Sequence, residues 1–388
     1  MSGLGARIGA LLEAAKAKTG LDNFGDESFR EGLERLVDAA DSEARLTPMG
    51  AAVLDGNITD LLRQRLEIED WFTRHPEIED EVISAPLIGL GLPRTGSTAF
   101  SCLLAEDPAV RVMRNWEQMQ VCPPPERATY ESDPRIALAE TAMQLRNARF
   151  PRMKQMVPST ATSPVECQNL MGMHFRSQIF QAMFHVPSYV RWLHHEADLK
   201  PTYHWVKRCL KLLQWRCPSK LGPPTHWRLK NPSHILFIDD LNAVFPDARF
   251  WMTHRDVADV IPSVADLYYE LHKAFSKNVD KLWLGEVNID YCESGMTRII
   301  AFRDAGNDHR FFDVKFTEFQ RDPWPSIEAL YAWLSEELSD EARARMTTWR
   351  DDTPKDKHGT RTYDPADYGL DREALRHRFA FYRTRFGL

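Results

Sequence analysis

The chain has 388 residues, of which 43% are hydrophobic, enough for the core of one large domain or of one domain with an appendage. Its formal net charge of −7 argues against the broad basic surface that nucleic-acid binding requires. The six cysteines show no C-x-x-C pair, and no segment is apolar enough for long enough to span a bilayer. The composition therefore predicts a cytoplasmic protein with reduced thiols, and it leaves the oligomeric state open.

The N-terminal region, residues 1–80, reads as helical. Apolar residues recur at helical spacing in residues 29–40 and again in residues 58–72. No set of catalytic residue types occurs there. We expect residues 1–80 to form a helical cap on a core of residues 81–350, which is followed by a basic loop and tail helix in residues 351–388.

A strand, a glycine-rich turn and a helix are predicted in succession near residue 90. The apolar run 86–90 precedes the turn GLPRTGST at residues 91–98, and the helix-compatible run 99–105 follows it. Such a turn directs backbone N–H groups and a helix N-terminus at one point, which suits a phosphate or a sulfate.

The turn matches the P-loop of nucleotide triphosphatases only in part. Gly91 and Gly96 have the P-loop spacing, but Ser97 stands where the P-loop lysine is expected. The cation of the turn is Arg94, which can hold two oxygens of one anion through two N–H groups. The alternative is an ordinary strand-to-helix turn that carries a surface arginine.

Residues 93–98, PRTGST, resemble the phosphosulfate loop of sulfotransferases that use 3′-phosphoadenylyl sulfate (PAPS), among them the tyrosylprotein and trehalose sulfotransferases. The resemblance implies that the loop holds the 5′-phosphosulfate of PAPS. The residues that it assigns to this site are Arg94, Thr95, Gly96, Ser97 and Thr98.

A second motif resembles the 3′-phosphate element of the same family. A strand over residues 250–254 leads to Arg255, and Ser263 follows about two helical turns later. A guanidinium and a hydroxyl together suit a phosphate with three acceptor oxygens. The alternative is a surface ion pair for Arg255.

The strand HWRLK, residues 226–230, ends in a lysine, as the family commonly has it. The resemblance assigns Lys230 to the bridging oxygen of the leaving phosphate. A histidine follows closely in cytosolic members and is their base, but here His234 lies further along the chain. His234 is therefore a candidate base, or else a residue that hydrogen-bonds at the start of a helix.

Three residues compete for the role of general base toward the acceptor. Glu117 is the leading candidate, because related sulfotransferases have a base glutamate at a similar distance after the loop; the alternative is a solvated or arginine-paired carboxylate. Glu166, in a Pro-x-Glu segment, is either a second candidate or a carboxylate at a helix N-terminus. His234 is the third candidate.

Two further elements are assigned by the resemblance. Phe316 opens the stretch FTEFQRDP and is expected to stack on adenine, or else to be a core phenylalanine. Lys357 and Arg361 lie in a basic tail that folds over the nucleotide in the family, or is otherwise a solvated loop.

An insertion at about residues 133–220 is rich in methionine, aromatic residues and histidine. Most of its apolar residues have helical spacing and are expected in the core. An insertion of this composition also suits a pocket for a small-molecule acceptor with apolar character.

We therefore predict an α/β fold with a central parallel sheet and flanking helices, similar to P-loop kinases, plus the N-terminal helical cap. The predicted function is transfer of a sulfuryl group from PAPS to a hydroxyl or amine, without a metal, because the cations are side chains. The alternatives are a nucleotide kinase or triphosphatase on the same fold, and a non-catalytic nucleotide-binding relative.

Overall fold

The computed structural model describes residues 3–149, 159–219, 225–353 and 363–388. Its centre is a sheet of five strands in the order β2-β3-β1-β4-β5, and every pairing is parallel. The strands are β1 (Leu87–Leu90), β2 (Val110–Arg111), β3 (His226–Lys230), β4 (Arg249–His254) and β5 (Phe311–Lys315). The predicted α/β class and the strands predicted at residues 86–90, 226–230 and 250–254 are confirmed.

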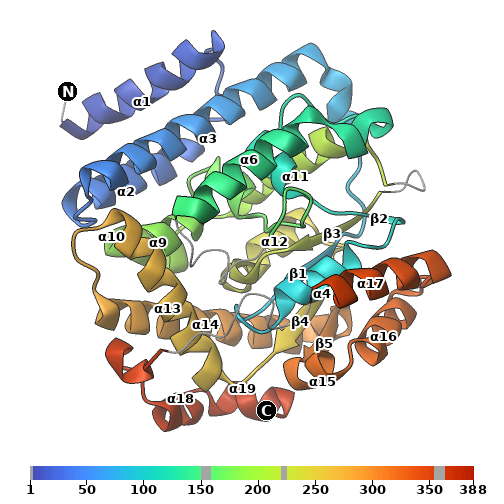
Figure 1. Cartoon of the computed structure of the whole chain (residues 1–388). Coiled ribbons are helices and arrows are strands. Elements are labelled where there is room, and N and C mark those ends of the chain that lie inside the picture. The colour runs from blue at the N-terminus through green and yellow to red at the C-terminus, as the bar shows by residue number, and fades with distance from the viewer. Residues whose placement is uncertain (1–2, 150–158, 220–224, 354–362) are drawn as a thin grey trace.

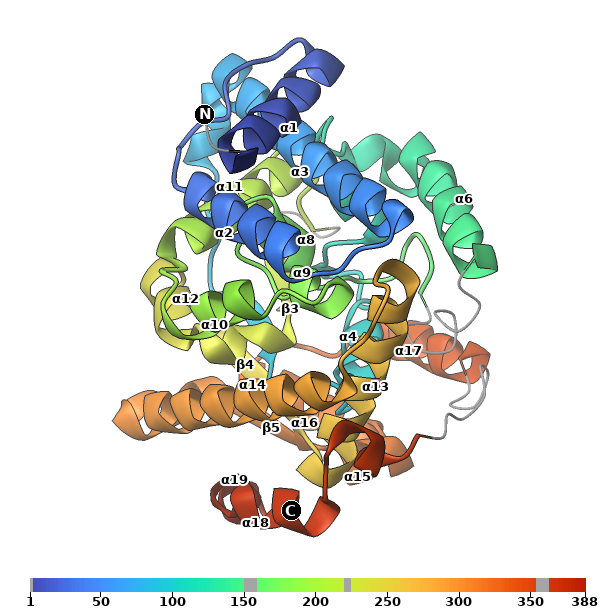
Figure 2. The same ribbon diagram turned by 90° about the vertical axis from the view of Figure 1, so that its left-hand side faces the viewer.

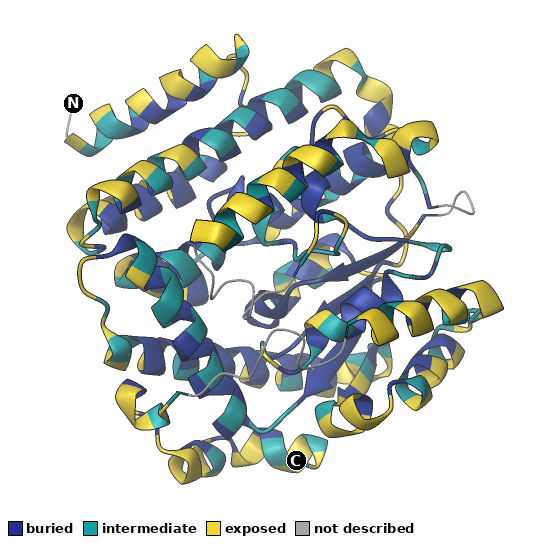
Figure 3. Cartoon of the chain, in the orientation of Figure 1, coloured by how far each residue is buried: buried dark blue, intermediate teal, exposed yellow. Residues whose placement is uncertain are grey.

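The central strands are apolar because helices cover both faces of the sheet. All four residues of β1 are buried, and Figure 3 shows the central strands of the sheet in the colour of buried residues. Gly89 has no side chain because the Trp251 ring of β4 occupies its place: a Cβ atom at Gly89 would lie 2.1 Å from that ring. Close packing of this kind fixes where β1 ends, and therefore where the glycine-rich turn begins.

The predicted N-terminal helices form one end of the molecule (Figures 1 and 2). They are α1 (Gly3–Thr19), α2 (Phe29–Ser42) and α3 (Pro48–Arg74), followed by the 3-10 helix η1 (Pro76–Asp80). Thr47 caps α3 by accepting a hydrogen bond from the Gly50 N–H. A Cβ atom at Gly50 would lie 2.1 Å from the carbonyl oxygen of Phe275, so α3 approaches the end of α13 through this glycine.

The middle of the chain contributes short helices around the sheet. They are α4 (Ser97–Leu104), α5 (Asn115–Met119), η2 (Arg127–Ser132), α6 (Pro134–Arg149), α8 (Gln168–Gly172), α9 (Ile179–Met183), α10 (Pro187–His195) and α11 (Lys200–Gln214). The predicted insertion is thus largely helical, and α9 packs against α13.

The C-terminal half adds the remaining helices. They are η3 (Pro232–Leu236), α12 (Ile238–Val244), α13 (Val257–Phe275), α14 (Lys281–Phe302), η4 (Arg303–Asn307), η5 (Asp308–Arg310), α15 (Phe316–Arg321), α16 (Trp324–Leu334), α17 (Asp340–Asp352), η6 (Pro365–Tyr368), α18 (Arg372–Arg378) and α19 (Ala380–Phe386). Helices α18 and α19 lie at the end of the molecule opposite α1–α3 (Figures 1 and 2).

All six cysteines are buried free thiols. None of the helices within the described ranges combines the length and the apolarity needed to cross a membrane.

Candidate active site

The glycine-rich turn joins β1 to α4 and has the backbone of an anion cradle. Gly91 and Gly96 have φ angles of 128° and 87°, and Arg94 between them has a φ of 62°. Gly96 is the left-handed residue directly before α4. A Cβ atom at Gly96 would lie 2.8 Å from the Phe316 ring, so both the conformation and the space favour glycine. The turn therefore presents the N-terminus of α4 toward the cavity described below.

The two predicted phosphate motifs meet at this turn. The Nε of Arg94 donates to the Ser263 hydroxyl of α13 over 3.2 Å. The guanidinium of Arg255 donates to the carbonyl oxygen of Arg94 over 3.3 Å and lies 4.6 Å from the centre of the Phe316 ring. Asp259 pairs with Arg255 at 3.3 Å. Residues separated by about 160 positions in the sequence thus form one cationic corner.

Lys230 brings a second cation to the turn from the end of β3. Its Nζ lies 2.6 Å from Oε1 of Glu166 and 3.5 Å from the Thr98 hydroxyl. The Lys230 side chain is almost fully buried, whereas that of Glu166 is 36% exposed and faces the cavity. The ammonium group therefore lies between the anion turn and a solvent-accessible carboxylate.

Backbone hydrogen bonds on both sides fix Glu166 in this place. The Val165 N–H donates to the Met113 carbonyl over 2.9 Å, and the Cys167 N–H donates to the Lys230 carbonyl over 3.3 Å. Helix α8 begins only at Gln168, so Glu166 belongs to the preceding loop. The Glu166 carboxylate therefore pairs with Lys230 and does not lie at a helix N-terminus, which was the alternative that the sequence left open.

A cavity of about 2120 Å³ opens beside the turn. Its polar half is lined by Arg94, Gly96, Ser97, Thr98, Lys230 and Arg255. Its apolar half is lined by Ile179, Ala182 and Met183 of α9 and by Val264, Leu267 and Leu271 of α13. Glu166 also lines the cavity. The cavity thus combines an anion site with an apolar groove, and the Glu166 carboxylate is accessible from it for proton transfer.

Comparison with known proteins identifies the family. The model described as "Sulfotransferase family" matches residues 86–340. The chain belongs to the sulfotransferase family. No curated protein matches the sequence at a significant level.

Two solved sulfotransferases are similar to this member of the family over nearly its whole length. Sulfotransferase STF9 from Mycobacterium avium shares 32% identity and a TM-score of 0.89, and the alignment covers 97% of this chain and 96% of that one. Sulfotransferase STF1 from Mycobacterium tuberculosis H37Rv shares 31% identity and a TM-score of 0.85, with 96% and 98% covered.

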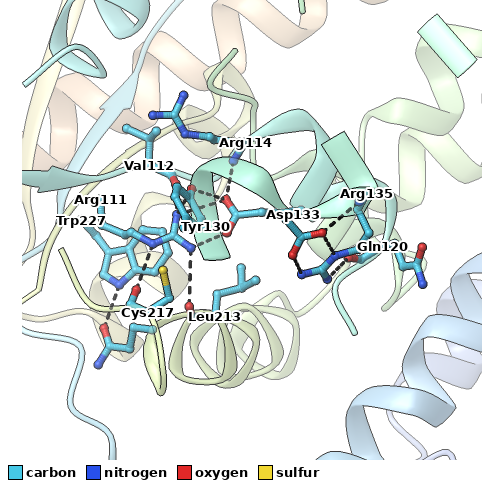
Figure 4. Close-up of polar contacts among 12 residues, drawn as sticks. Arg111, Val112, Arg114, Gln120, Tyr130, Asp133, Arg135, Leu213, Cys217 and Trp227 are labelled. Atoms are coloured by element: carbon cyan, nitrogen blue, oxygen red, sulfur yellow. Dashed lines mark hydrogen bonds and ion pairs between the residues drawn. The ribbon is translucent and has the colours of Figure 1, made fainter. Parts of the chain in front are cut away.

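The structure contradicts the expectation that Glu117 faces the transferred group. Its carboxylate is fully buried and forms a two-point ion pair with Arg111, and it also accepts hydrogen bonds from the Tyr130 hydroxyl and from the Arg114 N–H. Figure 4 shows Arg111 in this network beside Tyr130 and the backbone of Cys217. Glu117 does not line the cavity. The arginine-paired alternative describes its environment.

Glu117 and Arg111 stabilise each other because both are withdrawn from water. Burial alone lowers the pKa of the Arg111 guanidinium, but the nearby Glu117 carboxylate outweighs this effect and the pKa is raised. The pair also caps the N-terminus of α5, since the Glu117 carboxylate accepts a hydrogen bond from the Arg114 N–H. Its role is to join β2, α5 and η2.

His234 is likewise removed from the cavity. It is 1% exposed, its Nδ1 lies 2.9 Å from the Tyr203 hydroxyl, and burial lowers its pKa to about 3. An imidazole with this pKa and no access to the acceptor is unsuited to the predicted role of base. The alternative of a histidine bonded within η3 and its surroundings fits the geometry.

The remaining assigned residues divide into three groups. Phe316 lines the cavity against Gly96 and Arg255, so an adenine ring could reach only the part that these neighbours leave open. Thr95 is fully buried, and its hydroxyl donates to the Leu92 carbonyl over 2.8 Å. Its side chain therefore shapes the turn and only its backbone can face an anion. Lys357 and Arg361 lie outside the described residues.

Two tyrosines of the cavity wall, Tyr268 and Tyr291, are not predicted from the sequence. Tyr268 lies on the apolar stripe of α13 that begins after Ser263, and extending that stripe along the helix would have found it. Tyr291 comes from α14, and no local pattern singles it out.

One group with metal-ligand chemistry occurs among the described residues, away from the cavity. The ring nitrogens of His194 and His195 lie 3.2 and 3.1 Å from the Asp290 carboxylate. The second ring nitrogen of His194 is bonded to Gln181 over 2.9 Å, so hydrogen bonds account for both of its nitrogens.

Proposed function

We propose that this sulfotransferase transfers the sulfuryl group of PAPS to the hydroxyl or amine of a small organic acceptor. The observation that carries the proposal is the position of Lys230 between the anion turn and Glu166, with Nζ 3.5 Å from Thr98 and 2.6 Å from the carboxylate. A cation for the leaving oxygen and a carboxylate for the acceptor proton then lie side by side.

The donor side uses the cationic corner. The backbone N–H groups of residues 96–98, with Arg94, hold the 5′-phosphosulfate, while Arg255 and Ser263 hold the 3′-phosphate. The left-handed Gly96 and the packing of Phe316 support this fit, because a side chain at position 96 would clash with the Phe316 ring and disturb the turn. The kinase alternative lacks the P-loop lysine and leaves the Arg255 and Ser263 pair without a role.

The chemistry requires two side chains in opposite roles. The acceptor oxygen forms a bond to sulfur while the bond from sulfur to the bridging phosphate oxygen breaks, and its electron pair stays on the phosphate. Lys230 stabilises the charge that develops on this oxygen, and Glu166 accepts the proton that the acceptor loses. Glu166 replaces Glu117 in this role, since Glu117 has no access to the cavity.

Binding and turnover can be tested separately. Calorimetry should give tighter binding of adenosine 3′,5′-bisphosphate than of ATP with magnesium, and mass spectrometry should detect sulfated products from a panel of alcohols, phenols and amines with PAPS. Preference for ATP with magnesium would establish the kinase alternative. Tight bisphosphate binding without any sulfated product would establish the non-catalytic alternative.

A further inference from the structure

The apolar half of the cavity is continuous with the donor side through a single helix. In α13, Ser263 contacts Arg94, and the apolar residues that follow line the cavity: Val264, Leu267, Tyr268, Leu271, Ala274 and Phe275. Glu270 and Lys273 line it beside them and pair with each other at 3.3 Å. At 1.5 Å per residue, the stripe from Val264 to Phe275 is about 16 Å long. Three residues of α9 form the facing wall: Ile179, Ala182 and Met183. The groove therefore extends well beyond the point of sulfuryl transfer.

Three buried polar atoms of the cavity wall have no hydrogen-bond partner among the described residues: Nε of Arg114, the hydroxyl of Tyr291 and the amide Nε2 of Gln178. The last two belong to neutral side chains, of which Tyr291 is 1% exposed and Gln178 is 4% exposed. A buried donor without a partner is unfavourable, so such atoms in a binding site indicate a ligand that completes their hydrogen bonds. Both neutral side chains can donate, and a ligand oxygen can accept.

Glu166 lines the same cavity as Tyr268 and Tyr291. Burial and, less strongly, the Glu166 carboxylate raise the pKa of Tyr268. Burial together with Cys292, Tyr268 and Glu166 raises the pKa of Tyr291 well above its usual value. Tyr291 is therefore a neutral hydroxyl near the proposed base, and it can donate to an oxygen without competing for the acceptor proton.

We propose that the groove between α9 and α13 is the acceptor subsite, and that its substrates are uncharged alcohols with an extended apolar body. Tyr291 donates a hydrogen bond to the reacting hydroxyl and positions it against Glu166, while Gln178 donates to a further oxygen of the head. This inference rests on the proposed sulfuryl transfer.

Charge and shape select this class over others. A carboxylic acid would place a second negative charge beside Glu166. An alkyl amine is protonated at neutral pH, so it has no lone pair for attack on sulfur. A short alcohol would leave most of the stripe on α13 in contact with water.

The first test is a homologous series of straight-chain primary alcohols from butanol to decanol, assayed with PAPS. We expect kcat/KM to rise about fourfold for each added methylene, because each buries apolar surface against α13. Leu271→Asn should flatten this rise, whereas Leu282→Asn, an exposed leucine of α14 outside the cavity, should leave it unchanged. A profile that does not change with chain length would overturn the assignment of the groove.

The second test addresses Tyr291. We expect Tyr291→Phe to lower kcat/KM for decanol about tenfold or more and to leave the affinity for adenosine 3′,5′-bisphosphate unchanged. Tyr269→Phe, on α13 but off the cavity wall, is the matched control and should behave like the wild type. An unchanged kcat/KM in Tyr291→Phe would show that this hydroxyl does not position the acceptor.

The outcomes separate this inference from the function on which it rests. Sulfation of phenols or amines but of no alkyl alcohol would overturn the acceptor class and leave sulfuryl transfer intact. Failure to bind adenosine 3′,5′-bisphosphate and to sulfate any acceptor would remove the proposed function, and the acceptor subsite with it.

Discussion

The ammonium group of Lys230 lies 2.6 Å from the carboxylate of Glu166, and the residue after Glu166 donates its N–H to the carbonyl of Lys230. The two residues are thus joined through both side chain and backbone, although one ends β3 and the other precedes α8. These two contacts fix a cation and a carboxylate at the edge of the anion turn. Because sulfuryl transfer requires charges of both signs in fixed positions, this pair is the basis of the predictions that follow.

Glu166→Gln should lower turnover by about 10²–10⁴ with little change in the affinity for adenosine 3′,5′-bisphosphate, because the amide keeps the size of the side chain and loses its basicity. Steady-state kinetics and calorimetry measure the two quantities. A variant with full turnover would show that another group accepts the proton.

Glu117→Gln should act on stability instead of chemistry. Removing one charge of the buried Arg111–Glu117 pair leaves the guanidinium without compensation and should lower the free energy of unfolding by about 3–5 kcal/mol. Urea unfolding measures this loss, and turnover per folded molecule should stay close to that of the wild type. A stable Glu117→Gln protein that has lost turnover would return the base to Glu117.

Lys230→Met should lower kcat by about 10²–10³, since methionine keeps the apolar stem and removes the charge on the leaving side. Lys281→Met is a matched control, because Lys281 pairs with Asp367 on the surface and does not line the cavity. Equal rates for the two variants would exclude Lys230 from the reaction.

Arg255→Ala should raise the KM for PAPS about 10- to 100-fold and change kcat little, because the contact lies away from the transferred group. The wild type should prefer PAPS over adenylyl sulfate without the 3′-phosphate, and the variant should lose that preference. Arg343→Ala, at a surface pair with Glu328, serves as the control. An unchanged preference would mean that another residue reads the 3′-phosphate.

His234→Gln should change the pH dependence of stability and not the chemistry. Burial lowers the folded-state pKa of His234 to about 3, whereas the unfolded chain takes up the proton near the ordinary histidine pKa of 6.5. Above pH 6.5 the histidine is neutral in both the folded and the unfolded chain, so its burial does not make stability depend on pH. As the pH drops below 6.5, stability falls by about 1.4 kcal/mol per pH unit, because only the unfolded chain takes up the proton.

Urea unfolding of wild type and His234→Gln at pH 7.5 and 5.5 measures this slope. The variant should have the shallower slope and should keep turnover within about twofold at pH 7.5. Loss of turnover with bisphosphate binding preserved would instead identify His234 as the base.

The strands at residues 86–90, 226–230 and 250–254 and the position of the anion turn could be predicted from the sequence, because both depend on neighbouring residues. An apolar run, a pair of glycines and a helical run are local patterns, and parallel strands bring the motifs that follow them to one edge of the sheet. The contact between Arg94 and Ser263 fits this logic, since Arg94 lies in the turn after β1 and Ser263 lies on the helix that follows β4.

The choice between Glu117 and Glu166 was decided only by the tertiary structure. Their distances from the turn in sequence do not tell which way a side chain points. Arg111 is buried on β2, and Glu117, six residues later, supplies the carboxylate that compensates its charge and is withdrawn from the cavity. Glu166 stays accessible because its loop is fixed by the backbones of Met113 and Lys230, which come from distant parts of the chain. Tyr291 reaches the same cavity from α14 for the same reason: burial and the direction of a side chain depend on packing between elements, and a single sequence records that packing only indirectly.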